Sequence, residues 1–342
     1  MSMRPSWNQQ VRYRLRKLQG WWRRLEVPPR VRLVSGPASV ALAPTDVVAV
    51  SLVRDGGAHV ESFLRHHFAL GVRHVVLLDN GSTDSTVAEA RRFDDVTVLA
   101  TALPYRTHKY ALKRYLVDRF GGTSWCLALD IDERFTYPLS GRLSLDLFVR
   151  YLDSRRFTAV VAQMLDLFAE GPVSGWPTGM ELAGRCKWYD NTALGAAPYY
   201  PFDNRVSNPA IRFHHGGVRK LAFGVDAFLT KHPLLRRGGG ALPSVTSSHY
   251  CHRARVADVS CALLHFKFDR DFPRRCREAV RTGSYFGGSQ EYKAYLRWLE
   301  GDPDPGLRTG RCRRLDSPDQ LIAEGFLEVS ADYLSYAAAA VG

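Results

Sequence analysis

The chain has 342 residues, of which 45% are hydrophobic and 24% charged, an ordinary composition for a globular protein. This composition excludes a disordered chain, a collagen-like repeat and a coiled coil, and the length predicts one large or two small domains. The formal net charge is +13, but residues 1–36 hold nine basic side chains and one acidic one. More than half of the excess charge lies in that segment, so the overall charge does not predict nucleic-acid binding.

The first predicted feature is a basic arm over residues 1–36. Trp and Leu side chains are interleaved there with arginines, and an amphipathic helix of this composition suits an anionic membrane surface. The alternatives are a solvated tail and a helix packed on the body. Proline and glycine at positions 28, 29, 36 and 37 predict a linker before the folded domain.

Two absences in the sequence bear on the compartment. No apolar segment follows the basic N-terminus as in a signal peptide, and no run approaches the ~20 apolar residues that cross a bilayer. The six cysteines form no CxxC pair, which argues against a zinc ribbon and a disulfide framework. We therefore expect a cytoplasmic protein with reduced thiols, peripheral at the inner face of the membrane if the arm binds lipid.

From residue 46 onward, apolar runs alternate with segments of helical periodicity. This order predicts an α/β fold with a mostly parallel sheet and right-handed crossovers, which binds ligands at the carboxyl ends of its strands. The predicted strands are 46–53, 74–78, 96–100 and 125–130, and the predicted helices are 60–70, 82–93 and 107–120. In the second half, the sequence predicts a strand at 158–168, an irregular binding loop or lid at 171–217 and a basic helix at 269–282.

Polar residues follow three of the first four strands. Arg54 and Asp55 follow the first, Asp79 and Asn80 the second, and the sequence Asp-Ile-Asp-Glu at 130–133 the fourth. Three carboxylates within four residues repel one another unless a cation compensates their charge. Since hard oxygen ligands suit Mg²⁺ or Mn²⁺, the pattern predicts a divalent-metal site at this edge. A polar loop of turn-forming residues is the alternative.

These motifs resemble those of a known family. Residues 79–84 (DNGSTD) and 130–133 (DIDE) are similar to the motifs of family-two glycosyltransferases with the GT-A fold. Residues 69–86 and 263–268 (LLHFKF) resemble patterns of a bacterial subgroup, and the likeness covers roughly residues 46–300. The resemblance implies metal-dependent transfer of a sugar, with inversion, from a nucleotide sugar to a hydroxyl group. The expected donor is a UDP-sugar, and the expected acceptor is a glycan or a lipid-linked compound in bacterial surface glycan synthesis.

The resemblance also implies an organisation of the chain. A single GT-A domain, residues 37–342, would follow the arm. It would contain a Rossmann-like, mostly parallel sheet flanked by helices, then a mixed acceptor-side region and terminal helices. We expect the nucleotide-binding half at 46–135, the acceptor-side half at 136–300 and a C-terminal extension at 301–342.

Candidate site residues lie at the positions that match the family's motifs. Asp79 would bind the nucleobase, and the Asp-x-Asp motif of Asp130 and Asp132 would meet the ribose and the metal. His265 in the late motif would complete the metal shell, and a histidine satisfied in the core is the alternative. The implied nucleotide-sugar contacts are Arg54, Asp55, Asp79, Asn80, Lys109, Asp130 and Arg219, and the implied metal ligands are Asp130, Asp132 and His265.

Basic residues outside the acidic motifs are candidates for phosphate contact. Lys109 and Arg114 lie on the helix before the acidic strand, and a solvated helix face is the alternative for both. Arg219 lies in a GGxR segment that resembles the subgroup's and would contact a phosphate or the acceptor, and Lys231 is a further candidate. The chain departs from many relatives at 54–56, which read Arg-Asp-Gly instead of Lys-Asn-Glu.

Inverting sugar transfer needs a general base that deprotonates the acceptor hydroxyl. Asp166, Glu170 and Asp203 are the carboxylates available in the second half. We predict Asp166 as the base, since it resembles the LDMF position of the subgroup. For each of the three, an aspartate or glutamate that caps a turn is the alternative.

Two other classes of function stay open. A nucleotidyltransferase also uses a metal and a related α/β sheet, but it usually has a Gly-rich basic loop after the first strand, of which residues 54–57 are a poor version. A non-catalytic protein that binds a membrane or nucleic acid would give the arm a role. It would leave the carboxylates at the strand ends unexplained.

Overall fold

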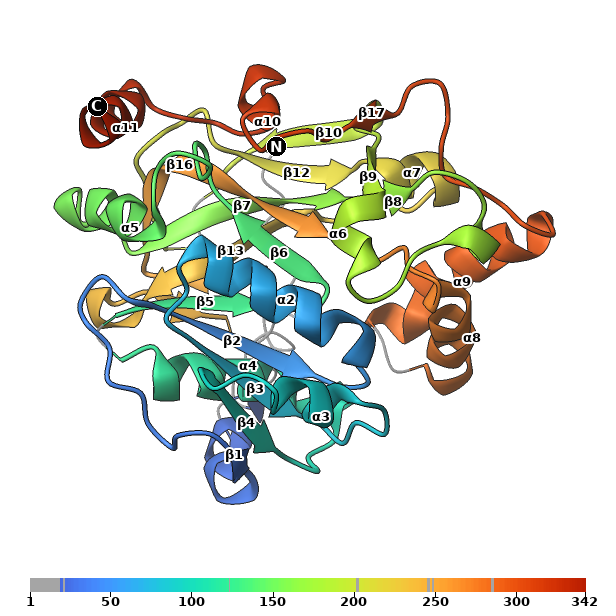
Figure 1. Ribbon diagram of the computed structural model, residues 1–342, viewed down its shortest axis with the longest axis horizontal. Helices are drawn as coiled ribbons and strands as arrows, with labels where there is room; N and C mark the ends of the chain where they lie inside the picture. The colour runs from blue at the N-terminus through green and yellow to red at the C-terminus, as the bar shows by residue number, and fades with distance from the viewer. Residues whose placement is uncertain are drawn as a thin grey trace, which may run out of the picture.

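The computed structural model describes residues 19–20, 22–122, 124–200, 203–244, 247, 249–283 and 286–342. The N-terminal part of the predicted arm, residues 1–18, lies outside the described residues. The described chain forms an α/β fold around a ten-stranded sheet, with helices on both faces (Figure 1). The predicted fold class, a mostly parallel sheet flanked by helices, is confirmed.

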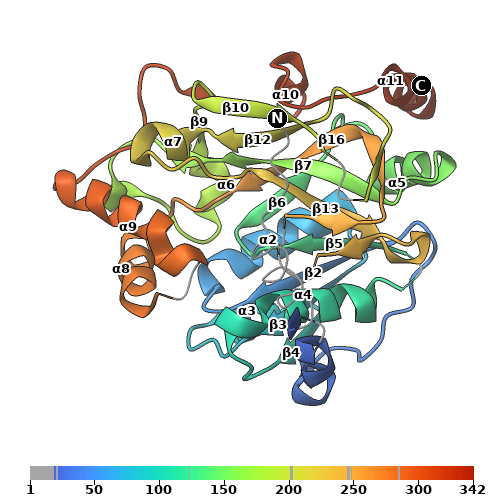
Figure 2. The same ribbon diagram turned by 180° about the vertical axis from the view of Figure 1, so that it is seen from behind.

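The parallel half of the sheet consists of the four strands predicted from the apolar runs. Its elements are β2 (Val47–Val53), α2 (Gly57–Leu70), β3 (His74–Asp79), α3 (Thr86–Ala90), β4 (Val96–Ala100), α4 (Tyr105–Phe120) and β5 (Trp125–Leu129). The strands pair in the order β4–β3–β2–β5. Val47 and Ala49 pack in the core beneath α2, whereas Val48 and Val50 pack against α4. Both faces are therefore buried between helices (Figures 1 and 2), as in other parallel sheets.

The second half of the sheet mixes strand directions. Its strands are β6 (Glu133–Thr136), β7 (Ala159–Asp166), β11 (Arg205–Val206), β13 (Thr230–Arg236) and β16 (Arg255–His265). β7, β11 and β16 run in the same direction as β2, whereas β13 lies between β5 and β7 and runs the opposite way. Because β13 is antiparallel to its neighbours, it begins at the edge where the parallel strands end.

Outside the main sheet, the second half forms small sheets and short helices. β8 (Phe168–Ala169), β9 (Cys186–Tyr189) and β17 (Arg313–Arg314) form one sheet, β10 (Leu194–Pro198) pairs with β12 (Arg212–Gly216), and β14 (Leu242–Pro243) pairs with β15 (Cys251–His252). The helices are α5 (Leu145–Ser154), α6 (Glu181–Arg185), α7 (Val218–Phe223), α8 (Phe272–Thr282), α9 (Phe286–Gly301), α10 (Gln320–Ala323) and α11 (Ala331–Val341). The region 171–217, predicted as an irregular loop, therefore contains short helices and strands at 173–175, 181–189, 194–198, 205–206 and 212–216, with irregular segments between them.

The described residues before residue 36 pack on the body. β1 (Arg32–Ser35) extends the sheet as the antiparallel neighbour of β4. Val27 is fully buried in the core with α4. Glu26 Oε2 lies 2.9 Å from His108 Nε2 of α4. Residues 22–35, which composition places in the arm, thus form part of the folded body in this structure.

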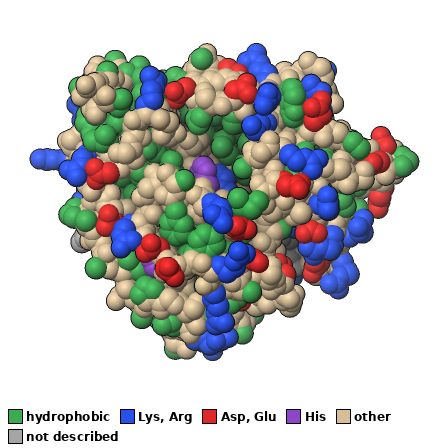
Figure 3. Space-filling model, viewed as in Figure 1, with side chains coloured by type: hydrophobic (Ala, Val, Ile, Leu, Met, Phe, Trp, Pro, Cys, Tyr) green, Lys and Arg blue, Asp and Glu red, His purple; other side chains and the backbone are tan. Residues whose placement is uncertain are grey.

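Exposed basic side chains gather on the two helices α8 and α9. Arg274, Arg277 and Arg281 of α8 are exposed, as are Lys293 and Arg297 of α9. Lysine and arginine side chains crowd the corresponding side of the space-filling view (Figure 3). The predicted basic helix is confirmed at 272–282. No helix among the described residues is both long and apolar enough to cross a membrane.

The C-terminal helix α11 is anchored in the main core. Tyr333 is fully buried, and its ring meets Phe148 and Tyr151 of α5 at centroid distances of 5.9 and 5.2 Å. Its hydroxyl donates to the carbonyl oxygen of Pro138 at 2.5 Å. Part of the predicted C-terminal extension is therefore a structural element of the body.

We expect Tyr333→Ala to lower the free energy of unfolding by about 3–5 kcal/mol, because it leaves a cavity beside the rings of Phe148 and Tyr151. Urea denaturation followed by circular dichroism measures this. The matched control is Leu334→Ala on the same helix, where the side chain is 43% exposed and the expected loss is below about 1 kcal/mol. Equal stability of the two variants would contradict the anchoring role of α11.

Candidate functional site

Charged side chains from both halves of the sheet meet at the edge where the parallel strands end. The strand register produces this arrangement. Val53, the last residue of β2, pairs with Asp79, while His265 at the end of β16 pairs with Asp166 on one side and Glu133 on the other. The pairing of the strands therefore fixes the relative positions of these residues, which do not depend on the loops alone.

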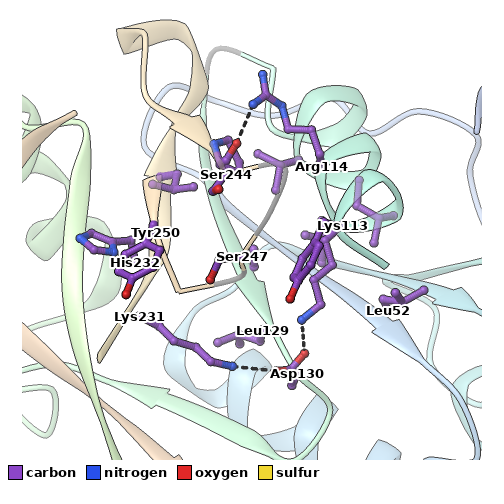
Figure 4. A pocket seen from close by; sticks show the side chains of 17 residues that line it. Leu52, Lys113, Arg114, Leu129, Asp130, Lys231, His232, Ser244, Ser247 and Tyr250 are labelled. Atoms are coloured by element: carbon purple, nitrogen blue, oxygen red, sulfur yellow. Dashed lines mark hydrogen bonds and ion pairs between the residues drawn. The ribbon is translucent and has the colours of Figure 1, made fainter. Parts of the chain in front are cut away.

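Asp130, the first residue after β5, is held by two lysines. Its Oδ1 accepts a hydrogen bond from Lys113 Nζ at 2.5 Å and its Oδ2 from Lys231 Nζ at 2.7 Å (Figure 4). Lys231 Nζ also donates to Glu133 Oε1 at 2.5 Å. Glu133 Oε2 accepts from the backbone N–H of Asp130 at 3.0 Å. We call these four side chains, Lys113, Asp130, Glu133 and Lys231, the lysine–carboxylate network.

Because the lysine–carboxylate network is largely buried, the charge of each side chain strongly affects the pKa values of the others. Glu133 is fully buried and Lys231 is 6% exposed. Burial raises the pKa of Asp130, but the ammonium groups of Lys113 and Lys231 outweigh this and hold that pKa well below its usual value. Burial lowers the pKa of Lys231, and Asp130 and Glu133 more than reverse the effect. The pKa of Glu133 is raised, chiefly by burial.

Asp132 begins a second chain of charged groups. His265 Nε2 lies 3.2 Å from Asp132 Oδ2, and His265 Nδ1 lies 2.5 Å from Asp166 Oδ1. Asp166 also accepts from Arg219 Nε and Nη2, both at 2.7 Å. Arg219 Nη1 in turn donates to Glu291 Oε1 of α9 at 3.2 Å. We call this series, from Asp132 to Glu291, the histidine chain.

The members of the histidine chain differ in exposure. The Asp132 side chain is 29% exposed, whereas those of His265 and Asp166 are 6% and 2% exposed. Burial raises the pKa of Asp166, but Arg219 and His265 outweigh this and hold it well below its usual value. Burial lowers the pKa of His265, and the carboxylates of Asp132 and Asp166 more than reverse the effect. Asp166 is thus enclosed, whereas the carboxylates at the two ends of the chain, Asp132 and Glu291 (33% exposed), are partly open to solvent.

The residues after β3 are tied to the backbone around them. The Asp79 carboxylate accepts from the N–H groups of Gly81 and Ser82 at 3.1 Å. The Asn80 amide donates to the carbonyl oxygens of Thr101 and Leu103 at 3.2 and 2.8 Å. Asp79 thus shapes its own turn, and Asn80 holds the loop that follows β4.

The loop after β2 is fastened to the loop after β3. Asp55 has a positive φ of 51°, and its Oδ1 accepts from the N–H of Thr83 at 2.8 Å. Asp84 Oδ2 accepts from the N–H of Gly57 at 2.8 Å. Arg54, by contrast, is an exposed side chain whose ion pair with Asp55 measures 3.7 Å. Because 82–84 make these loop contacts, α3 begins at residue 86 and not at the predicted residue 82.

Helix α4 contributes a different lysine from the one expected. Lys109 Nζ lies 4.9 Å from the centre of the Tyr110 ring, and Arg114 is paired with Asp118 on its own helix at 2.8 Å. Lys113, one helical turn after Lys109, reaches Asp130 instead. The i, i+4 spacing of the two lysines places them on one helix face, and this was the signal in the sequence that could have identified Lys113.

The other two candidate bases lie on the surface. Glu170 forms an exposed ion pair with Arg308. Asp203 is exposed, with a positive φ of 60°. Of the three carboxylates considered, Asp166 alone belongs to the charged groups at the strand ends.

Asp132 and His265 are the pair that fits a divalent metal. A carboxylate and an imidazole are both ligands of Mn²⁺-like ions. Among the described residues, no three His, Cys, Asp or Glu side chains converge closely enough to hold a metal alone. Mg²⁺ commonly binds one or two carboxylates together with substrate phosphates, so the pair fits a metal shared with a substrate. Both oxygens of Asp130 face lysines, and its metal role stays a prediction.

A cavity of about 40 Å³ lies beside Asp130, between α4 and the strands β2, β5 and β13. Lys113 and Lys231 point toward Asp130 from its two sides (Figure 4). Ser244, Ser247 and Tyr250 also line this cavity. The space accommodates a few water molecules and no nucleotide. A larger ligand at this edge would need the side of the strand ends that is open to solvent, where the Asp132 side chain is 29% exposed.

Comparisons with known proteins give only distant likenesses. No protein-family model and no curated protein matches the chain. Among solved structures, glucosyl-3-phosphoglycerate synthase from Mycobacterium tuberculosis in complex with Mn²⁺, UDP and glucosyl-3-phosphoglycerate is 22% identical, with a TM-score of 0.24 over 35% of this chain and 44% of that one. A mannosyltransferase from Pyrobaculum calidifontis in complex with GDP-Man and Mn²⁺ is 20% identical, with a TM-score of 0.28 over 44% of each chain.

A third likeness belongs to another class of enzyme. A nucleotidyl transferase from Methanothermobacter thermautotroptrophicus is 15% identical, with a TM-score of 0.22 over 38% of this chain and 65% of that one. The chain thus spans less than two thirds of each of these structures. TM-scores this low do not support an assignment of function, so the proposal below rests on the residues of the chain itself.

We expect Lys231→Met to destabilise the fold by about 3–5 kcal/mol, because it leaves the buried Glu133 carboxylate without its ammonium partner. Guanidinium denaturation measures the change. The matched control is Lys220→Met, which removes a 3.5 Å ion pair between exposed side chains and should cost less than about 1 kcal/mol. If both variants unfold at the same denaturant concentration, the lysine–carboxylate network does not stabilise the fold.

Proposed function

We propose that the chain is a metal-dependent glycosyltransferase of the GT-A type in family two, which transfers a sugar from a nucleotide sugar to a hydroxyl acceptor. The observation that best supports this is the meeting of Asp132 and His265, far apart in sequence, at 3.2 Å. They meet at the carboxyl ends of parallel strands, where open α/β sheets bind their ligands.

In this proposal the nucleoside lies over the ends of β2 and β3. Asp79 would accept a hydrogen bond from the nucleobase, since a carboxylate that receives two backbone N–H groups still has acceptor capacity. Asp55 and Asn80 would keep the two loops in place around the nucleoside. Arg54 is exposed beside them and free to turn toward a phosphate.

The diphosphate would lie beside Asp132 and His265, which would hold the metal. Bound there, Mn²⁺ or Mg²⁺ would stabilise the negative charge of the departing nucleoside diphosphate. Lys113, whose side chain is 20% exposed, would bring a further positive charge near the phosphates. In the proposal Lys113 thus takes the phosphate-contacting role that its position on the helix before the acidic strand suggested for Lys109.

The proposed reaction is a single displacement. The bond between the anomeric carbon and the diphosphate oxygen breaks while the acceptor oxygen bonds to the opposite face of that carbon. The proton of the acceptor hydroxyl passes to a base, and the configuration inverts. UDP as the nucleotide, a bacterial surface glycan or lipid-linked acceptor, and a peripheral location at the membrane stay predictions from the sequence resemblance and the arm.

We expect the protein to bind UDP in the presence of Mn²⁺, and the affinity to fall at least about tenfold with a chelator or in Asp132→Asn, because a phosphate-bridging metal loses its open carboxylate. Isothermal titration calorimetry measures both. The matched control is Asp316→Asn, in which the replaced side chain is 69% exposed and belongs to neither charged network.

GDP, CMP and dTDP serve as alternative titrants if UDP does not bind. Metal-dependent binding of any one of them, lost in Asp132→Asn and kept in Asp316→Asn, supports the donor site. Absence of binding by all four would overturn the proposed function. Binding that is independent of Mn²⁺ and unchanged by Asp132→Asn would overturn the metal-dependent mechanism.

A further inference from the structure

We propose that Asp166 and Arg219 are positioning residues that orient His265 toward Asp132, and that neither acts on the acceptor. This inference rests on the proposed function and replaces two roles that the sequence resemblance implied, namely Asp166 as general base and Arg219 as a ligand of phosphate or acceptor. It concerns three side chains that come from β7, β16 and α7.

The hydrogen bonds define which way the imidazole faces. Nδ1 lies 2.5 Å from Asp166 Oδ1 and 3.0 Å from Arg219 Nη2. Because a carboxylate only accepts, the shorter contact assigns a proton to Nδ1. The other nitrogen, Nε2, then faces Asp132 Oδ2. With no metal bound, the same argument gives Nε2 a proton toward Asp132. The neutral imidazole whose one proton is held on Nδ1 by Asp166 would present a lone pair at Nε2, the atom that a metal beside Asp132 would need.

Both oxygens of Asp166 are occupied within the protein. Oδ1 receives His265 Nδ1 and Arg219 Nη2, and Oδ2 receives Arg219 Nε. The side chain is 2% exposed. A general base must lie within hydrogen-bond reach of the proton that it removes, and a carboxylate that is enclosed in this way does not meet a hydroxyl from solvent.

The guanidinium group of Arg219 likewise has its hydrogen-bond donors occupied within the protein. Its guanidinium forms a two-pronged pair with Asp166 and uses its remaining nitrogen, Nη1, for Glu291 of α9. Its side chain is 6% exposed. The turn before α7 places it there, since Gly216 and Gly217 have φ values of 88° and 60°, a region that glycine enters at the lowest steric cost.

This arrangement matches the way proteins commonly support a metal-binding histidine. The ring nitrogen that does not bind the metal donates to a carboxylate, which fixes the tautomer and the orientation of the ring. Loss of such a carboxylate typically lowers metal affinity by about 10- to 100-fold. Asp166 occupies the position of that carboxylate, and Arg219 holds Asp166.

The test is Asp166→Asn, which keeps the shape of the side chain but removes its negative charge. The new amide NH₂ group would also face one of the N–H donors of Arg219, so that one hydrogen bond is lost. We expect the affinity for Mn²⁺ with UDP, measured by calorimetry, to fall about 10- to 100-fold. Binding of Mn²⁺ alone, followed by electron paramagnetic resonance, should weaken in parallel. The double variant Asp166→Asn, His265→Gln should bind no more weakly than His265→Gln alone, because both changes act through the same ring.

A matched control is available in the same region of the fold. Asp269 is fully buried and accepts from His59 Nε2 at 2.8 Å and from Arg275 Nη1 at 2.7 and 2.8 Å. It thus forms an Asp–His–Arg cluster of the same composition. Asp269→Asn should lower the thermal unfolding temperature as Asp166→Asn does, but change Mn²⁺ affinity less than twofold.

The outcomes separate this inference from the proposed function. If the unmodified protein shows no Mn²⁺-dependent nucleotide binding, the proposed function fails, and the inference with it. If that binding is present and Asp166→Asn retains it within twofold, the inference alone is overturned. An equal loss of Mn²⁺ affinity in Asp269→Asn would also overturn it, since the effect would then reflect any buried ion pair.

Discussion

The compensation of buried carboxylates by basic side chains is the constraint on which the functional edge of this protein depends. At the strand ends Glu133 is fully buried and Asp130 is partly buried, and an unpaired buried carboxylate is costly. Lys231 lies between them, with Nζ 2.7 Å from Asp130 and 2.5 Å from Glu133, and comes from β13, which runs opposite to its neighbours β5 and β7. An antiparallel strand starts where its parallel neighbours end. The insertion of β13 therefore delivers a cation to the place where the acidic motif needs one.

The parallel half of the fold could be predicted from the sequence because its signals are local. Short apolar runs predict strands, and the acidic motifs follow those runs directly, so Asp79, Asp130 and Asp132 could be placed at the strand ends. β13 gave no such signal, since its sequence, TKHPLLR, contains a lysine, a histidine and a proline among few apolar residues. Its pairing with both β5 and β7 depends on tertiary context.

The partners of the site residues were harder to predict than the residues themselves. His265 could be assigned to a strand end, but its contact with Asp166 follows from the register of β16 against β7, which a single sequence does not reveal. Lys113 was missed although it shares a helix face with Lys109. The residues of the acidic motif belong to different networks. Asp130 is held by lysines in the lysine–carboxylate network, whereas Asp132, in the histidine chain, faces a histidine and solvent.

The position of β13 also affects how the chain folds during its synthesis. During synthesis the first four parallel strands emerge long before residue 230, so β5 stays an open edge until the chain has grown past residue 236. An unpaired strand edge is prone to pair with other chains, and domains tend to fold as units during translation. A fragment that ends at residue 135 would leave that edge exposed and Glu133 without its cation. Residues 46–135 thus lack the strand that covers β5, and the sheet can close only after residue 236 has been synthesised.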